Sequence, residues 1–332
     1  MGLPVRLVLH ARDRQTAEPA ARAAFARIAS LDRMMSDYRP DSELRRIDSH
    51  AGTFVPVSAE LLTVVTRALE ISRASNGAFD PTVAPLVALW RESRTTRQLP
   101  QPSRLAAARA LVGWQQVEID AGRSAVRLTR PGMRLDLGGV AKGYILQEAV
   151  RTLREQGVIR ALVAAGGDIV VGDAPPGRAG WEVEAPGSDP AFAARASRLT
   201  NAALATSGSS EQFVEINGIR YSHIVDPRTG LGVTTSRGAQ VIADDAALAD
   251  ALATALTILS DEDGKALQAR FPEAMVSLTG ATRQPQTPAD RVTCWPGAVG
   301  LNASAKMIRI TAAAAAGTIQ IWRQSCAVSP IR

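Results

Sequence analysis

The sequence has little of what identifies several common protein classes. It holds only two cysteines, Cys294 and Cys326, which excludes a disulfide-rich scaffold and a zinc site built from cysteines. No run of about 18 uncharged apolar residues occurs, which is the length that a membrane-spanning helix requires. Only three of the 38 basic residues are lysine, so Lys142 within a glycine-rich segment stands out.

The usual nucleotide and hydrolase motifs are also missing. The chain contains no G-x-G-x-x-G after a strand-like run and no G-x-x-x-x-G-K-[ST]. It contains neither the G-x-S-x-G of nucleophile elbows nor the H-E-x-x-H of zinc proteases. The sequence therefore gives no support to a dinucleotide-binding domain, a P-loop NTPase, a serine hydrolase of that type or a zinc protease.

The composition is that of a globular protein, and its net charge is unevenly placed. Of the 332 residues, 46% are hydrophobic and 21% are charged, enough for a substantial core. A net charge of +6 by itself suggests a nucleic-acid or anionic-membrane partner. Residues 281–332, however, hold six basic side chains against the single acid Asp290. The remaining chain is nearly neutral, so we expect no nucleic-acid partner.

Hydrophobic periodicity predicts an α+β fold with mainly antiparallel sheets. Helical spacing of apolar residues predicts helices over residues 16–35, 58–74, 103–112, 138–157 and 245–259. Alternation or short apolar runs predict a hairpin over 116–128 and strands over 4–10, 135–137, 161–173, 181–185, 199–206, 212–216, 237–243 and 274–278. Asn-Gly and two prolines interrupt the helical rhythm over residues 76–90.

The chain is predicted to divide near residue 280. Residues 1–280 carry the periodic segments and form the expected catalytic domain. Residues 281–332 have no clear periodicity, and we expect a basic, poorly ordered tail outside the core.

The segment from Asp136 to Tyr144 is the first that suggests chemistry. An acid follows a strand-like run, the glycines Gly138 and Gly139 permit close backbone approach, and a helix begins with Lys142 in its first turn. Helix N-termini and free amides favour phosphate groups. An ordinary strand–turn–helix connection explains the glycines equally well at this point.

Three further positions have both a functional and a structural interpretation. His223 lies beside an acid and an arginine in SHIVDPRTG, where it could act as an acid–base group, contact phosphate or simply cap a turn. Asp250 and Thr254 share one face of an Ala- and Leu-rich helix. A buried Asp there needs a cation, an arginine or a backbone amide as its partner.

Two aromatic residues in loops suggest a planar ligand. Tyr38 and Phe79 both lie in loop-like segments of a chain that is only 4% aromatic. Stacking on a flat ring is one role for them, and core packing is the commoner role for Phe79.

Taken in order, seven segments resemble the ApbE family, the FAD:protein FMN transferases. They are MSDYRPDSELRRID, NGAFDPTVAPLVALW, RLDLGGVAKGY, ALVAAGGDIVVGD, LATSGSSEQFV, YSHIVDPRTG and ADALATAL, spread over residues 1 to about 280. The resemblance implies an ApbE-like fold and a site assembled from most of these segments.

The resemblance also assigns residues to roles. The implied flavin-site residues are Met1, Tyr38, Ala78, Phe79, Asp80, Asp136, Lys142 and Ile224. The implied magnesium ligands are the backbone carbonyl of Gly139 and the side chains of Asp250 and Thr254, and the implied catalytic residue is His223.

The activity that the resemblance implies is transfer of FMN from FAD, with Mg²⁺, to a Thr or Ser hydroxyl of an acceptor flavoprotein, releasing AMP. Such acceptors are typically subunits of membrane redox complexes. The same residues would suit a pyrophosphatase that converts FAD to FMN and AMP, or a non-catalytic FAD-binding protein. Family members are usually exported, and no signal peptide precedes the first strand-like run here. We therefore expect either a cytoplasmic protein or an export signal missing from this sequence.

Overall fold

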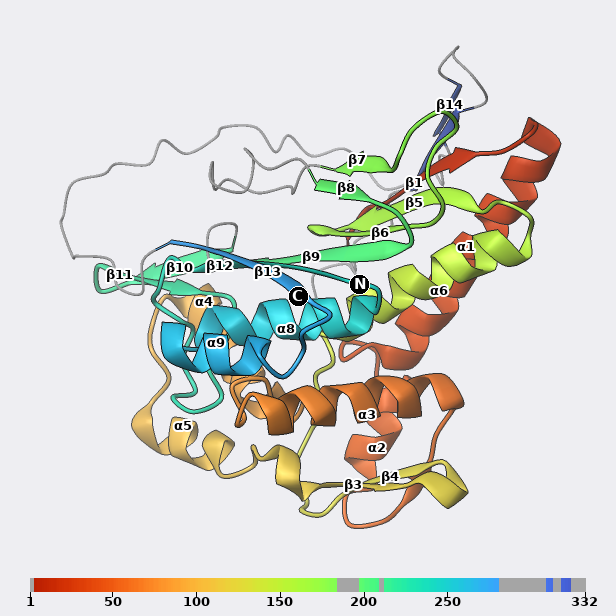
Figure 1. The fold of residues 1–332 in the computed structure, drawn as a ribbon. Coiled ribbons are helices and arrows are strands. Elements are labelled where there is room, and N and C mark those ends of the chain that lie inside the picture. The colour runs from red at the N-terminus through yellow and green to blue at the C-terminus, as the bar shows by residue number, and fades with distance from the viewer. Residues whose placement is uncertain (1–2, 184–196, 209–211, 281–308, 313–317, 324–332) are drawn as a thin grey trace.

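A sheet of eight strands, each paired antiparallel with its neighbours, forms the centre of the molecule (Figure 1). The computed structural model describes residues 3–183, 197–208, 212–280, 309–312 and 318–323. In spatial order the strands are β13 (Met275–Thr279), β12 (Gly238–Ala243), β9 (Ala202–Gly208), β6 (Asp168–Val171), β5 (Arg160–Ala165), β1 (Val5–His10), β15 (Thr318–Arg323) and β14 (Arg309–Ala312). The predicted α+β class with mainly antiparallel sheet is confirmed.

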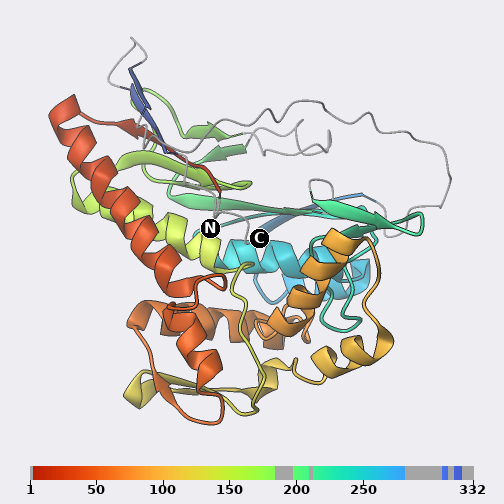
Figure 2. The same ribbon diagram turned by 180° about the vertical axis from the view of Figure 1, so that it is seen from behind.

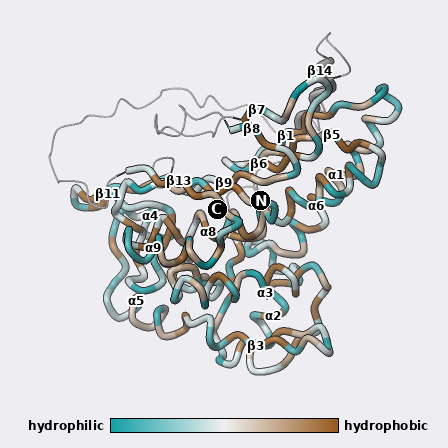
Figure 3. Tube along the Cα trace, viewed as in Figure 1, coloured by the Kyte–Doolittle hydropathy of each residue, from teal (hydrophilic) through white to brown (hydrophobic). Residues whose placement is uncertain are grey.

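Three helices cover one face of this sheet (Figures 1 and 2). They are α1 (Arg14–Met35), α6 (Ala141–Glu155) and α8 (Ala246–Ile258). A Cβ atom added at Gly143 would lie 2.0 Å from the carbonyl oxygen of Ala246, so only glycine allows α6 and α8 to approach this closely. The main hydrophobic core lies between these helices and the sheet, and Figure 3 shows hydrophobic stretches along both.

The hairpin β5–β6 corrects the prediction of one continuous strand over residues 161–173. Gly166 and Gly167 have φ values of +54° and +92°, in the region that glycine enters without strain. The chain reverses at this pair, so that Ala165 lies opposite Asp168. The turn places Asp168 at the first position of β6.

Smaller elements pack around this framework. The opposite face of the large sheet is covered by the pair β7 (Trp181–Val183) and β8 (Ser197–Leu199), which share a hydrophobic cluster with it. A second layer lies beyond the helices (Figure 1). It holds α2 (Glu43–Ser49), α3 (Ala59–Ala74), α5 (Pro102–Arg109) and the sheet of β2 (Val55–Pro56), β4 (Ala125–Leu128) and β3 (Val117–Asp120). The remaining elements are α4 (Ala84–Thr96), α9 (Asp261–Gln268) and the hairpin of β10 (Phe213–Ile216) and β11 (Ile219–Ser222).

Three local predictions were wrong. Residues 135–137 form no strand but an extended connection, and the helix that follows begins at Ala141 rather than at the glycine pair. The segment over 76–90 contains the start of α4, because Pro85 occupies the first turn, where a missing N–H costs nothing. A helix that the sequence analysis did not predict, α2, begins after Ser42, whose side chain accepts from the backbone N–H of Arg45.

Part of the segment after residue 280 pairs with the large sheet. β15 lies antiparallel to β1, with Val5 opposite Arg323, and β14 pairs with β15. Most of residues 281–332 lies outside the described residues, and a domain boundary at residue 280 stays a prediction. None of the helices that the structure describes is long and apolar enough to cross a membrane.

Candidate functional site

Eleven of the twelve residues predicted for the site line one pocket of about 510 Å³. Met1, the twelfth, lies outside the described residues. The pocket is formed by the loop after α1, the segment before α4, helices α4, α6 and α8, the end of β9 and the loop after β11. Its predicted members are Tyr38, Ala78, Phe79, Asp80, Asp136, Gly139, Lys142, His223, Ile224, Asp250 and Thr254.

A lysine and two aspartates form the buried inner end of the pocket. The Nζ atom of Lys142 donates to a carboxylate oxygen of Asp168 and, over 3.1 Å, to Oδ1 of Asp250. Only 17% of the Lys142 side chain is exposed, against 3% for Asp168 and 6% for Asp250. Each carboxylate also accepts a backbone N–H, Asp250 from Gly143 and Asp168 from Thr206. The close contact of α6 and α8 at Gly143 is what brings Asp250 to this position.

Burial and the neighbouring charges shift the pKa of Lys142 in opposite directions. Burial by itself lowers the pKa of its ammonium group, but the attraction of Asp250 and Asp168 outweighs burial, and the pKa is raised. Burial raises the pKa of Asp168, with Lys142 opposing that rise and Asp250 adding to it. Lys142 is therefore a fixed positive charge at the inner end.

The three residues predicted to bind magnesium lie together beside this cluster. A Cβ atom added at Gly139 would lie 3.0 Å from Oγ1 of Thr254, and Thr254 follows Asp250 by one helical turn. A carbonyl, a carboxylate and a hydroxyl are hard oxygen ligands of the kind that Mg²⁺ prefers. Both oxygens of Asp250 already accept one hydrogen bond, and each keeps a second lone pair.

This set fits a magnesium ion although it contains a single acid. No group of three or more His, Cys, Asp or Glu side chains that could hold a metal occurs among the described residues. Mg²⁺ keeps several water molecules and takes one or two carboxylates together with substrate phosphates, so one Asp is sufficient.

His223 is held so that one ring nitrogen stays available. Its backbone N–H donates to the carbonyl of Gln212 over 2.9 Å, and its Nδ1 lies 3.2 Å from the same oxygen. A carbonyl only accepts, so this bond places the proton of the neutral ring on Nδ1 and leaves a lone pair on Nε2. The surrounding protein lowers the pKa of His223 by desolvation, and the cations Arg94 and Lys142 lower it further.

Asp226 and Arg228, which follow His223 in sequence, stabilise the loop and do not contribute to the pocket. Asp226 accepts from the backbone N–H and from the guanidinium of Arg228, each over 2.9 Å. Trp90 donates from Nε1 to the carbonyl of Ser222, one residue before His223. These contacts fix the loop, and neither Asp226 nor Arg228 lines the pocket.

The outer end of the pocket is formed by Tyr38 and an arginine on α4. The Tyr38 side chain is 67% exposed, and the Arg91 guanidinium lies 4.3 Å from its ring centre. Arg91 also pairs with Asp37 over 2.6 Å and lies 4.0 Å from Asp136. Burial raises the pKa of Asp136, Asp37 raises it further, and the Gly138 N–H that it accepts opposes this rise.

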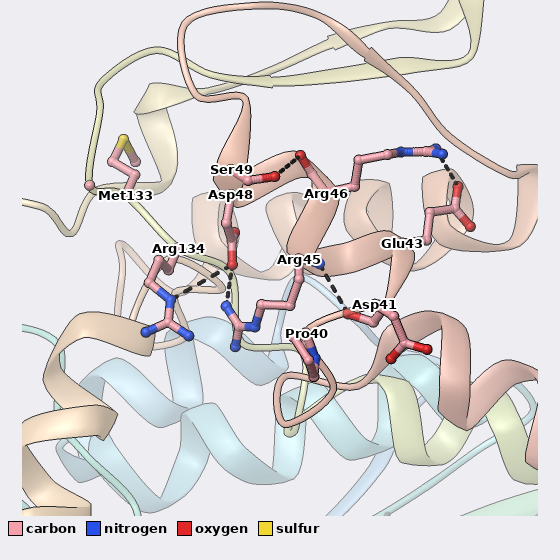
Figure 4. A pocket seen from close by; sticks show the side chains of 11 residues that line it. Pro40, Asp41, Glu43, Arg45, Arg46, Asp48, Ser49, Met133 and Arg134 are labelled. Carbon is pink, nitrogen blue, oxygen red and sulfur yellow. Dashed lines mark hydrogen bonds and ion pairs between the residues drawn. The ribbon is translucent and has the colours of Figure 1, made fainter.

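A second, more open pocket is lined by residues of α2, of the loop before it and of the segment around Met133 and Arg134 (Figure 4). Arg45 on α2 donates from Nε and Nη2 to the carbonyl of Asp37, over 2.9 and 2.6 Å, and from Nη1 to Asp48. Arg134 lies 3.8 Å from the same Asp48. Arg45 and Arg134 are therefore already paired, and Arg45 holds the loop that carries Tyr38. For this reason we do not treat this pocket as a second candidate site.

Asp80 uses its carboxylate to shape the pocket wall. Oδ1 accepts from the backbone N–H and hydroxyl of Thr82, and Oδ2 accepts from the backbone N–H of Trp114. Phe79 and Ala78, which precede it, are 5% and 0% exposed. The Gly/Pro-framed turn therefore places Ala78 and Phe79 in the pocket wall, and the Asp80 carboxylate stabilises that turn.

Sequence reasoning missed Asp168, Arg91 and Arg94. Asp168 was the one acid within the apolar stretch ALVAAGGDIVV, a signal that was present but unused. Arg91 and Arg94 are three residues apart, which places them on one face of α4, and both line the pocket. The predicted break over 76–90 concealed that helix.

Comparison with known proteins agrees with this geometry. The model of the ApbE family matches residues 1–277. A FAD:protein FMN transferase of Treponema pallidum is 33% identical over 273 residues, 76% of this chain and 75% of that protein. Its counterpart from Vibrio cholerae is 32% identical over 246 residues, 72% of this chain and 73% of that protein.

Solved structures of similar proteins share the fold. The ApbE protein of Thermotoga maritima superposes with a TM-score of 0.73 at 27% identity, covering 84% of this chain and 93% of that one. The flavinyl transferase ApbE of Pseudomonas stutzeri, in its apo form, gives 0.72 at 29% identity, with 85% and 88% covered. By its sequence, its fold and the family match over most of its length, the chain belongs to the ApbE family.

Proposed function

We propose that this protein is an FAD:protein FMN transferase that uses Mg²⁺ to move FMN from FAD to a Thr or Ser hydroxyl of an acceptor flavoprotein, releasing AMP. The observation that carries the proposal is that a fixed cation, a hard-oxygen ligand set and a histidine with a lowered pKa line the same pocket. Relatives bearing the name FAD:protein FMN transferase support the reaction class.

In this reaction the acceptor hydroxyl attacks the phosphorus of the FMN half of FAD. The new P–O bond forms as the bond to the AMP oxygen breaks, and the hydroxyl proton passes to Nε2 of His223. His223 suits this role because its pKa is lowered, so that the ring is neutral at pH 7. The negative charge that develops on the leaving phosphate lies in the field of Lys142 and Arg94, which both line the pocket.

The ligand set determines where a metal ion would act. Asp250, Thr254 and the carbonyl of Gly139 would hold Mg²⁺, which when bound neutralises charge on the phosphoanhydride. Thr206 Oγ1, at the edge of the pocket, is buried and has no hydrogen-bond partner among the described residues, as expected where a polar ligand completes the site.

The outer end would receive the flavin. The Tyr38 ring is backed by Arg91 and open to solvent on its other side, which suits stacking on a flat ring system. We propose that the acceptor is a subunit of a membrane redox complex, which approaches from this open side.

The test is incubation of the full chain with FAD, Mg²⁺ and a candidate acceptor domain, followed by denaturing electrophoresis and in-gel flavin fluorescence. We expect fluorescence on the acceptor band only when all three components are present. Release of AMP and FMN without labelling of any acceptor tested would identify a pyrophosphatase instead. Binding of FAD with no release of AMP would identify a flavin-binding protein.

A further inference from the structure

Two buried carboxylates share one ammonium group at the inner end of the pocket. Lys142 comes from α6, Asp250 from α8 and Asp168 from the first position of β6. Only Asp250 belongs to the proposed metal-binding set, and Asp168 does not line the pocket. Only 3% of the Asp168 side chain is nevertheless exposed, and its carboxylate accepts two hydrogen bonds.

Lys142 and a divalent cation would compete for Asp250. The ammonium lies 3.1 Å from Oδ1 of Asp250, and a cation bound to the same carboxylate would repel it. With Asp250 as its sole counter-ion, Lys142 would be left as an unpaired buried charge whenever metal bound there. Unpaired buried charges are costly, so metal binding would be weak.

Asp168 removes this conflict. One of its oxygens accepts from Lys142 and the other from the backbone N–H of Thr206, which fixes the carboxylate on β6. The turn at Gly166 and Gly167 fixes the start of that strand.

We propose that Asp168 is a positioning residue that holds the Lys142 ammonium in place and so frees the remaining lone pairs of Asp250 for the metal ion, an inference that rests on the proposed function. Asp168 touches neither substrate nor metal in this arrangement. It sets the affinity for the metal through Lys142.

The first measurement is Mn²⁺ binding to the full chain without FAD, read by electron paramagnetic resonance of the free ion. Asp168→Asn keeps an acceptor for the Thr206 N–H but loses the charge, and it raises the dissociation constant by about tenfold. Lys142→Met removes the competing ammonium and lowers the constant. Glu148→Gln is the matched control, because Glu148 is also a buried acid paired with arginines and lies on the same helix as Lys142. It leaves the constant unchanged.

The second measurement follows the side-chain NMR signal of Lys142. The chain has three lysines, so selective ¹³C and ¹⁵N labelling gives three side-chain signals, assigned with Lys142→Arg and Lys265→Arg. In the wild type, added Mg²⁺ leaves the Lys142 signal distinct, because Asp168 still holds the ammonium. In Asp168→Asn, Mg²⁺ moves that signal towards the position of the exposed Lys265.

Both results are required, and either one failing overturns the proposal. A tenfold weaker Mn²⁺ affinity with an unmoved Lys142 signal would mean that Asp168 acts by its charge alone. An unchanged affinity in Asp168→Asn, or weaker binding in Lys142→Met, contradicts the competition. If Asp168→Asn does not fold, the Mn²⁺ affinity of Lys142→Met and the Mg²⁺ response of the Lys142 signal in the wild type decide together. Wild-type protein that binds Mn²⁺ as described but labels no acceptor contradicts the proposed transferase and leaves this inference standing.

Discussion

At the inner end of the pocket the three charged groups are buried and bonded to one another. At the outer end the Tyr38 ring and the Arg91 guanidinium are partly open to water, beside two carboxylates, Asp37 and Asp136, that are each 14% exposed. Lys142, Asp168 and Asp250 are each at most 17% exposed. At the outer end, Tyr38 is 67% exposed and the Arg91 side chain is 41% exposed. The same kinds of contact, an ion pair and a hydrogen bond, therefore operate in two different dielectric surroundings.

From this difference we predict that the inner end governs the rate of the proposed transfer and the outer end the affinity for FAD. Interactions between charges are strong where water is excluded and weak where it is not. Changes at the inner end should therefore reduce the rate of transfer, and changes at the outer end should mainly weaken FAD binding. An outer-end substitution that slowed transfer more than an inner-end substitution would contradict this division.

The largest effect is expected at Asp250. Asp250→Asn removes the carboxylate of the proposed metal set but keeps a side chain of the same shape, and Lys142 retains Asp168. We expect transfer at saturating FAD to fall by about 10⁴-fold, the order of several kcal/mol that a catalytic metal supplies. The measurement is acceptor labelling over a Mg²⁺ titration. Near-normal labelling at ordinary Mg²⁺ concentrations would remove Asp250 from the metal site.

His223 comes next. His223→Ala should reduce transfer by about 10³-fold, the order that a general base contributes, and should leave FAD affinity unchanged. FAD affinity is read by quenching of flavin fluorescence, and transfer by acceptor labelling. His50, which is exposed and bonds to the backbone of Arg46, is the control, and His50→Ala should change neither quantity. Equal losses of binding and transfer in His223→Ala would point to a binding role.

The pH dependence of transfer follows from the environment of His223. Desolvation lowers the pKa of this histidine below its usual 6.5, so the neutral, proton-accepting form persists to lower pH. We expect kcat/KM to stay level down to pH 6.5 and to fall by about tenfold per pH unit only below the lowered pKa. An acid limb centred above pH 6.5 contradicts the assigned environment.

A smaller effect is expected at the outer end. Arg91→Gln removes the cation behind the Tyr38 ring and the pair with Asp37. These partly exposed contacts are worth about 1 kcal/mol, so FAD affinity should fall about fivefold with little change in kcat. Arg104→Gln, which breaks an exposed pair with Glu92 near the same helix, is the control. A larger fall in kcat than in affinity would contradict the division between the two ends.

The smallest effect on the site is expected from removing residues 281–332. FAD affinity should stay within about twofold, because the pocket is lined entirely by residues before 280. Thermal stability should fall, since β1 loses its neighbour β15. Calorimetry and flavin fluorescence on the trimmed chain check both expectations. Loss of FAD binding without unfolding would place part of the site in the removed segment.

The parts of the fold that the sequence predicted are those whose pattern is local. The helical spacing over residues 16–35 and 58–74 and the strand alternation over 4–10 depend on one buried face each, and α1, α3 and β1 match them. The apolar run 161–173 was read as one strand because its two halves are equally hydrophobic. Only the positive φ values at Gly166 and Gly167, which a sequence does not display, show the reversal.

The sequence predicted eleven residues that line the pocket, but not Arg91 or Arg94, and not the bonds between the charged groups. Motifs identified Lys142 and Asp250 as important, yet they lie 108 positions apart in sequence, and no local pattern states that they contact each other. That contact depends on the missing side chain at Gly143, where α6 meets α8. Asp168 was overlooked because its partner comes from another element. Asp80 lines the pocket while its carboxylate binds Thr82 and Trp114, and its role towards the flavin stays a prediction.

The most direct test of the central claim is mass spectrometry of an acceptor domain after incubation with FAD and Mg²⁺. We expect one FMN joined through phosphate to a Thr or Ser side chain, an equal amount of AMP, and loss of both products with His223→Ala while that variant still binds FAD. An acceptor that stays unmodified while AMP accumulates, or modification that persists undiminished in His223→Ala, would contradict it.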